Sequence, residues 1–138
     1  MATTAFANVR RAFDLTSRNY IVTGGSQGIG FALVDAIAQM GGNVVAMDIK
    51  DKPGQDFSAL SKQYGVKAQY LQVDVTDEEG LKGAFQKSID VLGSLHGCVT
   101  CAGLALEKPF EETSWPEARR IHDVNVCFNL ILISMIPD

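Results

Sequence analysis

The sequence predicts an α/β fold, a doubly wound parallel sheet with helices on both faces that is truncated after about four strands. Short apolar runs alternate along the 138 residues with segments whose apolar residues recur at helical spacing. Capping residues and glycines stand at the ends of the expected helices. A loop with four glycines in eight residues, TGGSQGIG, directly follows the first apolar run. Strands that alternate with helices are connected most readily by right-handed crossovers, which favours the doubly wound arrangement.

Four apolar runs predict the strands, over residues 19–23, 43–49, 68–75 and 95–101. The second run, NVVAMDI, is almost continuously apolar, which is typical of a strand that is buried on both faces of a parallel sheet. Residues 29–40 are expected to form a helix that stops at Gly41 and Gly42. Residues 55–64 are expected to form a second helix, closed by Gly65.

Two capping sequences predict where the later helices begin. Thr76 and Glu79 have the Thr-x-x-Glu form of a capping box, so a helix is expected from this point to about Leu92. Ser114 is a suitable N-cap because a proline stands in the first turn that follows it. The helix that opens at Ser114 is expected to carry Asn125.

Composition and charge exclude several classes of partner. The net charge of −4 offers no basic surface, so no nucleic acid is expected to bind. The longest apolar run, residues 128–136, is far shorter than the ~20 residues that span a bilayer, so no membrane partner is expected. The first twenty residues lack the apolar stretch of a signal peptide. The expected location is therefore cytoplasmic, with a short organelle transit segment as the alternative.

Two of the three cysteines, Cys98 and Cys101, have the C-x-x-C spacing. They lie in an expected strand, where residues three positions apart face opposite sides of the sheet. A redox-active C-x-x-C normally opens a helix, and the sequence contains no second pair of cysteines for zinc. We therefore expect two buried structural cysteines and no metal site.

The glycine-rich turn favours the binding of a phosphate group. Glycine permits a positive φ and a close approach of the backbone, and the N-terminus of the following helix offers free N–H groups. Asp48 ends the second strand twenty positions after Gly28, where a carboxylate can bind the hydroxyls of a ribose. Gly30 is followed by Phe31 and not by Lys-Ser/Thr, which excludes a P-loop nucleotide triphosphatase. The pattern predicts a bound dinucleotide; the alternative is a tight turn without a ligand.

Several segments in the expected order resemble the short-chain dehydrogenase/reductase family. Residues 23–30 have the family's TGxxxGxG spacing, and Asp74-Val75 matches its adenine-contacting Asp-Val. The residues Thr100-Cys101-Ala102-Gly103 stand where the family has Asn-Asn-Ala-Gly, with both asparagines replaced. Val124-Asn125-Val126 matches a helix-borne asparagine of the family. The resemblance runs from about residue 15 to residue 126, and the lead-in FDLTSRN is similar to that of polyol and sugar-alcohol dehydrogenases.

The resemblance implies a Rossmann-type sheet and assigns cofactor-binding residues. The pyrophosphate would be surrounded by Gly24, Ser26, Gln27, Gly28, Ile29 and Gly30. The adenosine half would lie beside Asp48, Ile49, Asp74 and Val75, and the nicotinamide-side ribose beside Cys101, Ala102 and Gly103. A 2′-phosphate would be repelled by Asp48, so NAD(H) is the expected cofactor. NADP(H) is the alternative, because Lys50 and Lys52 lie close enough to compensate in part.

The family's hydride transfer uses a tyrosine, a lysine, a serine and an asparagine, and the sequence matches only the asparagine, as Asn125. The 138 residues contain no Tyr-x-x-x-Lys motif. The complete form is expected to transfer hydride between nicotinamide and a secondary alcohol or ketone, a polyol or sugar. The present chain is expected to bind cofactor without turnover. A non-catalytic nucleotide-binding or interaction module, or a truncated product without function, are the alternatives.

The expected domain organisation follows from these assignments. Residues 1–18 form an N-terminal arm, residues 19–126 the dinucleotide-binding half, and residues 127–138 an apolar tail that departs from the family's pattern. The tail is expected to lack cover, and the fourth strand to lie at an open edge of the sheet. Both features predict self-association.

Overall fold

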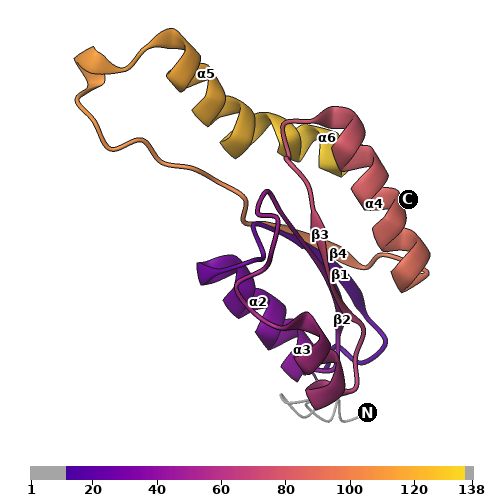
Figure 1. Cartoon of the computed structure of the whole chain (residues 1–138). Helices are drawn as coiled ribbons and strands as arrows, with labels where there is room; N and C mark the ends of the chain where they lie inside the picture. Colours follow the sequence, from indigo (N-terminus) through magenta and orange to yellow (C-terminus); the bar gives the residue numbers. More distant parts are fainter. Residues whose placement is uncertain (1–11, 136–138) are drawn as a thin grey trace, which may run out of the picture.

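The computed structural model describes residues 12–135, in which four parallel strands form one sheet between two layers of helices (Figure 1). The strands are β1 (Asn19–Thr23), β2 (Asn43–Asp48), β3 (Ala68–Gln72) and β4 (Gly97–Thr100). Their order across the sheet is β3-β2-β1-β4, and every neighbouring pair is parallel. The chain thus winds outward from β1 and then crosses to its other side. The predicted doubly wound α/β sheet is confirmed.

The helices are α2 (Gly28–Gln39), α3 (Phe57–Tyr64), α4 (Glu78–Leu92), α5 (Trp115–His122) and α6 (Phe128–Ser134). A 3₁₀ turn, η1 (Phe110–Glu112), precedes α5, and a π-helical turn, η2 (Asp123–Cys127), joins α5 to α6. In Figure 1, α2 and α3 cover one face of the sheet, whereas α4 lies on the other face. No helix within the described range is long and apolar enough to cross a membrane.

Alternate residues of β1 contribute to two hydrophobic cores on opposite faces of the sheet. Ile21 belongs to a core that also holds Phe85 of α4 and Phe128 of α6. Val22 belongs to the second core, together with Val34 of α2. Because both faces of β1 are buried, this strand is the structural centre of the domain and fixes where the ends of all four strands meet.

β1 has the predicted bounds, whereas the other three strands are shorter than the sequence predicts. β3 ends at Gln72 and not at Val75, because the last bond to β2 is the one from the Val73 N–H to the Asp48 carbonyl. The chain then turns at Asp74, whose carboxylate accepts hydrogen bonds from the N–H and hydroxyl of Thr76 at 2.9 and 2.7 Å.

This turn also overturns the predicted cap of α4. Thr76 is not the N-cap, because α4 begins at Glu78, one residue later than a cap at Thr76 requires, and the Thr76 hydroxyl donates to Asp74. Asp77 is the N-cap, and its carboxylate accepts a hydrogen bond from the Gly80 N–H at 3.1 Å. The cap predicted at Ser114 is confirmed, since the Ser114 N–H donates to the Glu117 carboxylate at 2.9 Å. Gly65 closes α3 in the left-handed conformation, as expected.

The C-terminal segment is covered on one face. Phe128 and Leu132 are each 1% exposed in the core beside α4, whereas Leu130 and Ile133 are 69% and 65% exposed. The prediction that the tail lacks cover is therefore wrong for the face that carries Phe128 and Leu132. These two residues are four positions apart, so they point in the same direction from a helix. Two further expectations stay predictions: that residues 127–138 depart from the family pattern, and that the chain self-associates. Residues 136–138 lie outside the described residues.

The N-terminal arm expected over residues 1–18 lies largely outside the described residues. Its last part is packed against the body. Leu15 contacts the core beneath α2, and its N–H donates to the Met40 carbonyl at 2.9 Å.

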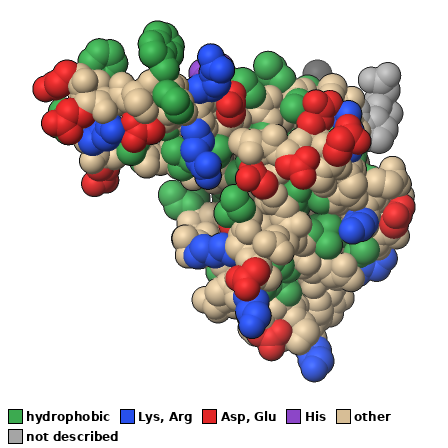
Figure 2. Space-filling model, turned by 45° about the horizontal axis from the view of Figure 1, so that its top comes forward, with side chains coloured by type: hydrophobic (Ala, Val, Ile, Leu, Met, Phe, Trp, Pro, Cys, Tyr) green, Lys and Arg blue, Asp and Glu red, His purple; other side chains and the backbone are tan. Residues whose placement is uncertain are grey.

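Between β4 and α5 the chain leaves the body and returns (orange in Figure 1). We call residues 101–114 the β4–α5 loop. An ion pair of 2.8 Å between Lys108 and Glu117 joins this loop to α5. Phe110 and Trp115 are exposed here, and Figure 2 shows acidic and hydrophobic side chains side by side on the projecting part.

Candidate functional site

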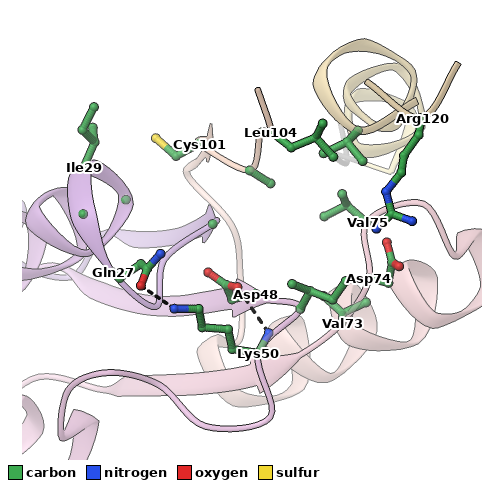
Figure 3. Close-up of a pocket in the computed structure, with 17 residues that line it drawn as sticks. Gln27, Ile29, Asp48, Lys50, Val73, Asp74, Val75, Cys101, Leu104 and Arg120 are labelled. Carbon is green, nitrogen blue, oxygen red and sulfur yellow. Dashed lines mark hydrogen bonds between the residues drawn. The ribbon is translucent and has the colours of Figure 1, made fainter. Parts of the chain in front are cut away.

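A cavity of about 540 Å³ lies where the four strands end (Figure 3). It is bounded by the loops that follow β1, β2, β3 and β4 and, on the far side, by α5 and η2. Of the residues predicted to bind a cofactor, all except Ser26 line it: Gly24, Gln27, Gly28, Ile29, Gly30, Asp48, Ile49, Asp74, Val75, Cys101, Ala102 and Gly103. Residues spread over eighty positions of sequence thus share one cavity, because parallel strands bring their carboxyl ends to the same edge.

The glycine loop is closely packed on its inner side. A Cβ atom on Gly30 would lie 2.1 Å from the Gly24 carbonyl oxygen, and one on Gly24 would lie 2.7 Å from the backbone of Cys101 and Ala102. Gly28 differs, because it has a φ of +57° and nothing within 4 Å of the position of its Cβ. It also begins α2 and lines the cavity. The loop therefore presents an open backbone surface at a helix N-terminus, which suits a phosphate group.

Ser26 is placed behind the cavity wall. It is fully buried, and its N–H donates to the Asp48 carboxylate at 3.1 Å. Its hydroxyl oxygen has no hydrogen-bond partner among the described residues. Ser26 thus connects the glycine loop to the end of β2 and holds the carboxylate that faces the cavity.

The Asp48 carboxylate is held from two sides. Besides Ser26, the N–H of Lys50 donates to it at 3.3 Å, and the Lys50 ammonium in turn contacts the Gln27 side-chain oxygen across the cavity rim (Figure 3). Tyr70 donates its hydroxyl to the Lys50 carbonyl. Burial and the carboxylates of Asp48 and Asp51 raise the pKa of Tyr70 to about 12. Tyr70 therefore stays protonated and acts as a structural donor, not as a base.

A second carboxylate, Asp74, lies at the other end of the cavity. Its two hydrogen bonds from Thr76, and secondarily the charge of Arg120, hold its pKa below the ordinary value, so it is ionised at neutral pH. Figure 3 shows the Arg120 side chain reaching from α5 toward Asp74, past Val75. The cavity thus has one acidic group and one basic group at each end: Asp48 with Lys50, and Asp74 with Arg120.

Sequence reasoning missed four residues that line the cavity: Val73, Leu104, Arg120 and Val124. A signal for two of them was present, because Arg120 and Val124 are four positions apart and so share one face of a helix. Nothing local in the sequence indicates that this face is directed at the cavity. Lys50 also lines the cavity, as its place two positions after Asp48 suggests.

Asn125, the predicted catalytic residue, does not line the cavity. Its side-chain oxygen accepts a hydrogen bond from the Leu104 N–H at 2.9 Å, and its side-chain nitrogen donates to the Leu104 carbonyl at 3.0 Å. Both bonds fix the loop that follows β4, and Leu104 in turn lines the cavity. In this structure Asn125 is therefore a positioning residue for the cavity wall, and its catalytic role stays a prediction.

The two cysteines of the C-x-x-C pair have different surroundings. Cys98 packs against the core that holds Ile21, and burial raises the pKa of its thiol to about 12. Cys101 lies beyond the last residue of β4 and lines the cavity, so the expectation of a buried structural cysteine is wrong there. The reason is that β4 ends at Thr100, where the chain turns away from the sheet. An inert, protonated Cys98 thiol does not suit a redox pair.

The comparisons with known proteins agree with this geometry. The family model "short chain dehydrogenase" matches residues 18–135. A 2,5-dichloro-2,5-cyclohexadiene-1,4-diol dehydrogenase of Sphingobium indicum is 33% identical over 89% of this chain and 50% of its own length. A cyclopentanol dehydrogenase of Comamonas testosteroni is 33% identical over 77% of this chain and 42% of its own.

Solved structures give the same result. The crystal structure of an NADPH-dependent 3-quinuclidinone reductase from Rhodotorula rubra superposes with a TM-score of 0.84 at 27% identity, over 97% of this chain and 52% of that protein. The chain spans about half the length of the relatives that it matches. Because the family model covers nearly all of the described residues, the chain belongs to the short chain dehydrogenase family.

Proposed function

We propose that this chain binds a nicotinamide dinucleotide in the cavity at the strand ends and is the cofactor-binding portion of an oxidoreductase. The observation that carries the proposal is the placement of the open Gly28 backbone and the Asp48 carboxylate in one cavity. A helix N-terminus with room for a phosphate and a carboxylate suited to a ribose are the two groups that recognise an adenosine diphosphate. The family relationship supports the same cofactor.

Each part of the cofactor has a group in the cavity that suits it. The pyrophosphate would lie against the backbone of residues 24–30, where the glycine at position 28 leaves space. The adenosine ribose would bind Asp48, and the adenine would lie between Val75 and the Asp74 end of the cavity. The backbone of Ala102 and Gly103 would face the nicotinamide-side ribose. When bound, the nicotinamide supplies the hydride acceptor or donor.

We infer a preference for NAD(H) over NADP(H). The Asp48 carboxylate is held in place by the N–H groups of Ser26 and Lys50, so it cannot easily turn away from a 2′-phosphate. At an effective dielectric constant near 20, two such charges repel by a few kcal/mol, on the order of 4 at 4 Å. The Lys50 ammonium on the same rim acts in the opposite direction, but it is engaged with Gln27. The carboxylate therefore decides the preference.

The complete form is proposed to transfer hydride between nicotinamide and a secondary alcohol or ketone. Two relatives carry alcohols in their names, a cyclohexadiene diol and cyclopentanol. A polyol or sugar stays the substrate class that the lead-in before β1 favours. The sequence of 138 residues has no Tyr-x-x-x-Lys motif, so this chain alone is expected to bind cofactor without turnover.

The test is a titration of the full chain with NADH and with NADPH, followed by fluorescence energy transfer from Trp115. Saturable binding of NADH that is at least about tenfold tighter than that of NADPH is expected. Asp48→Asn should reduce or reverse this ratio. Asp51→Asn is the matched control, because Asp51 is a nearby carboxylate that does not line the cavity, and it should leave the ratio unchanged.

The outcomes separate the two parts of the proposal. Tighter binding of NADPH than of NADH would refute the preference and leave cofactor binding intact. Absence of saturable binding for both nucleotides, in a chain whose circular dichroism shows the α/β fold, would refute cofactor binding itself.

A further inference from the structure

A second group of chemically active side chains lies at the π-helical turn, away from the cofactor cavity. Among the described residues, His122, Asp123 and Cys127 are a group whose imidazole nitrogen, carboxylate oxygen and sulfur all lie within 4.8 Å of one another. The Cys127 sulfur is 3.3 Å from the His122 Nδ1. None of the three residues lines the cofactor cavity, so the cavity does not explain why they converge.

The convergence is a consequence of the π-helical geometry of η2. In an α-helix, residues three and four apart share a face, so Cys127 would lie below Asp123 and be turned away from His122. Residues 123–127 form a π-helical turn, and its wider winding brings residues five apart into line. His122 and Cys127 are five apart, and Asp123 and Cys127 are four apart. One turn therefore directs three different donors at one point.

We propose that His122, Asp123 and Cys127 bind a divalent transition metal ion, with zinc as the ion that suits this donor set. Zinc takes thiolate, imidazole and carboxylate ligands at about 2.3, 2.0 and 2.1 Å in tetrahedral geometry. Those bond lengths place neighbouring ligand atoms about 3.3–3.6 Å apart, close to the separation of the Cys127 sulfur and the His122 nitrogen. A thiolate and a carboxylate together balance the charge of the ion. A thiolate and an imidazole also disfavour magnesium and calcium, which prefer oxygen ligands.

Solvent can reach the site. His122 is exposed, and Asp123 lines a surface hollow of about 520 Å³ between Thr76 and the start of α5. Arg120 lines the same hollow, but Figure 3 shows its side chain extending toward Asp74. Three protein ligands leave the fourth position of a tetrahedral ion to water or to an external ligand.

A metal at this turn would affect the cofactor cavity through one residue. Asn125 lies inside the turn, between two of the ligands, and its side chain holds Leu104 at the cavity wall. An ion that joins residues 122, 123 and 127 would hold the turn in its π-helical form and so keep Asn125 in place. The Leu104 amide hydrogen should exchange more slowly when metal is present.

The test uses the full chain, reduced and free of metal, titrated with Co²⁺ as a spectroscopic probe and then competed with Zn²⁺. The expected result is one ion per chain with a sulfur-to-cobalt charge-transfer band that zinc abolishes. Cys127→Ser should remove the band. His122→Ala should weaken binding by about tenfold or more, since it removes a direct ligand. Cys101→Ser is the matched control and should change neither the band nor the affinity.

Two spectroscopic results would overturn the proposal. One is the absence of a sulfur-to-cobalt band in the unmodified chain. The other is a band that is lost in Cys101→Ser and kept in Cys127→Ser, which would assign the metal to the C-x-x-C pair. If Cys127→Ser fails to fold, His122→Ala decides the question, because an exposed side chain can be truncated without disturbing the core. Unchanged Co²⁺ affinity in that variant would also refute the site.

Discussion

The two walls of the cofactor cavity are built in opposite ways. The glycine-loop wall, residues 24–30 with the end of β2, is fixed by contacts between main-chain atoms that leave no space for a Cβ at Gly24 or Gly30. The helical wall, residues 103–104 with α5 and η2, is held by side chains. Asn125 bonds to Leu104, Lys108 pairs with Glu117, and Phe128 anchors the segment in the core.

The difference indicates which parts of the site can vary. A wall made of main-chain contacts depends on glycine itself, so almost any substitution there forces backbone atoms apart. A wall held by side chains can lose or exchange one contact and keep its shape at a cost of about 1 kcal/mol per neutral hydrogen bond.

The largest effect is expected where the helical wall enters the core. Phe128→Ala removes a buried ring and should lower the free energy of unfolding by about 3–5 kcal/mol, measured by urea denaturation. Leu130→Ala, two positions away on the exposed face of α6, is the control and should change it by less than about 0.5 kcal/mol. Equal losses in the two variants would show that α6 is not packed on the face that carries Phe128.

The next effect tests the glycine-loop wall. Gly30→Ala places a methyl group 2.1 Å from the Gly24 carbonyl oxygen, which neither backbone segment can easily avoid. We expect a loss of about 3 kcal/mol in unfolding free energy together with loss of NADH binding. Gly83→Ala in α4 is the matched control, because its Cβ would meet open space, and helix propensity should stabilise the chain by up to about 1 kcal/mol. A stable Gly30→Ala chain that binds NADH would contradict the main-chain model of this wall.

A smaller, local effect is expected at the contact between η2 and the β4–α5 loop. Asn125→Ala removes both hydrogen bonds to Leu104 and should lower the opening free energy of the Leu104 amide by about 1–2 kcal/mol, measured by hydrogen exchange. The Cys101 amide donates to the Thr23 carbonyl at the end of the sheet and serves as the internal reference. If both amides exchange faster by the same factor, Asn125 stabilises the whole domain and not this wall in particular.

The smallest effect concerns the ion pair between the loop and α5. Hydrogen bonds from Lys108 and Ser114 lower the pKa of Glu117 to about 2 from an ordinary value of 4.5. A lowered pKa in the folded chain means that Glu117 stabilises the fold above about pH 4.5 and that this contribution is lost as the pH falls toward 2. The melting temperatures of the unmodified chain and of Glu117→Gln should therefore differ near pH 6 and converge near pH 2. Glu111→Gln, a charge change on the same loop, should show no such convergence.

Much of the fold was predictable because its signals are local. Apolar runs and helical periodicity gave four strands in the right places, and Gly65 and Ser114 marked helix ends through conformations that their own residue types favour. The strand ends and one cap were not predictable, because they depend on competition between neighbours. The Asp74 carboxylate accepts two hydrogen bonds from Thr76 in the turn that follows β3, and Asp77 caps α4 in place of Thr76.

The site shows the same division between local and long-range information. The glycine loop and Asp48 are recognisable from spacing, since a strand, a turn and a helix place them without help from the rest of the chain. Arg120 and Leu104 lie far from the glycine loop in the sequence, and they line the cavity because the chain after β4 returns to the body, where Phe128 of α6 packs in the core that also holds Phe85 of α4. The π-helical turn has no sequence signal that we could identify, and it alone brings His122 and Cys127 together.

The central position of β1 has a consequence for the order of folding. The residues that pair between β1 and β2 are about two dozen positions apart in the sequence. Those that pair between β1 and β4, such as Tyr20 and Gly97, are nearly eighty positions apart. Longer loops cost more entropy to close and slow the contacts that depend on them. We expect β1, α2 and β2 to form an early nucleus, with β4 and the helical wall added last. The glycine loop would then fold before the helical wall has formed. A dinucleotide bound to the loop at that stage would offer the helical wall a surface on which to pack.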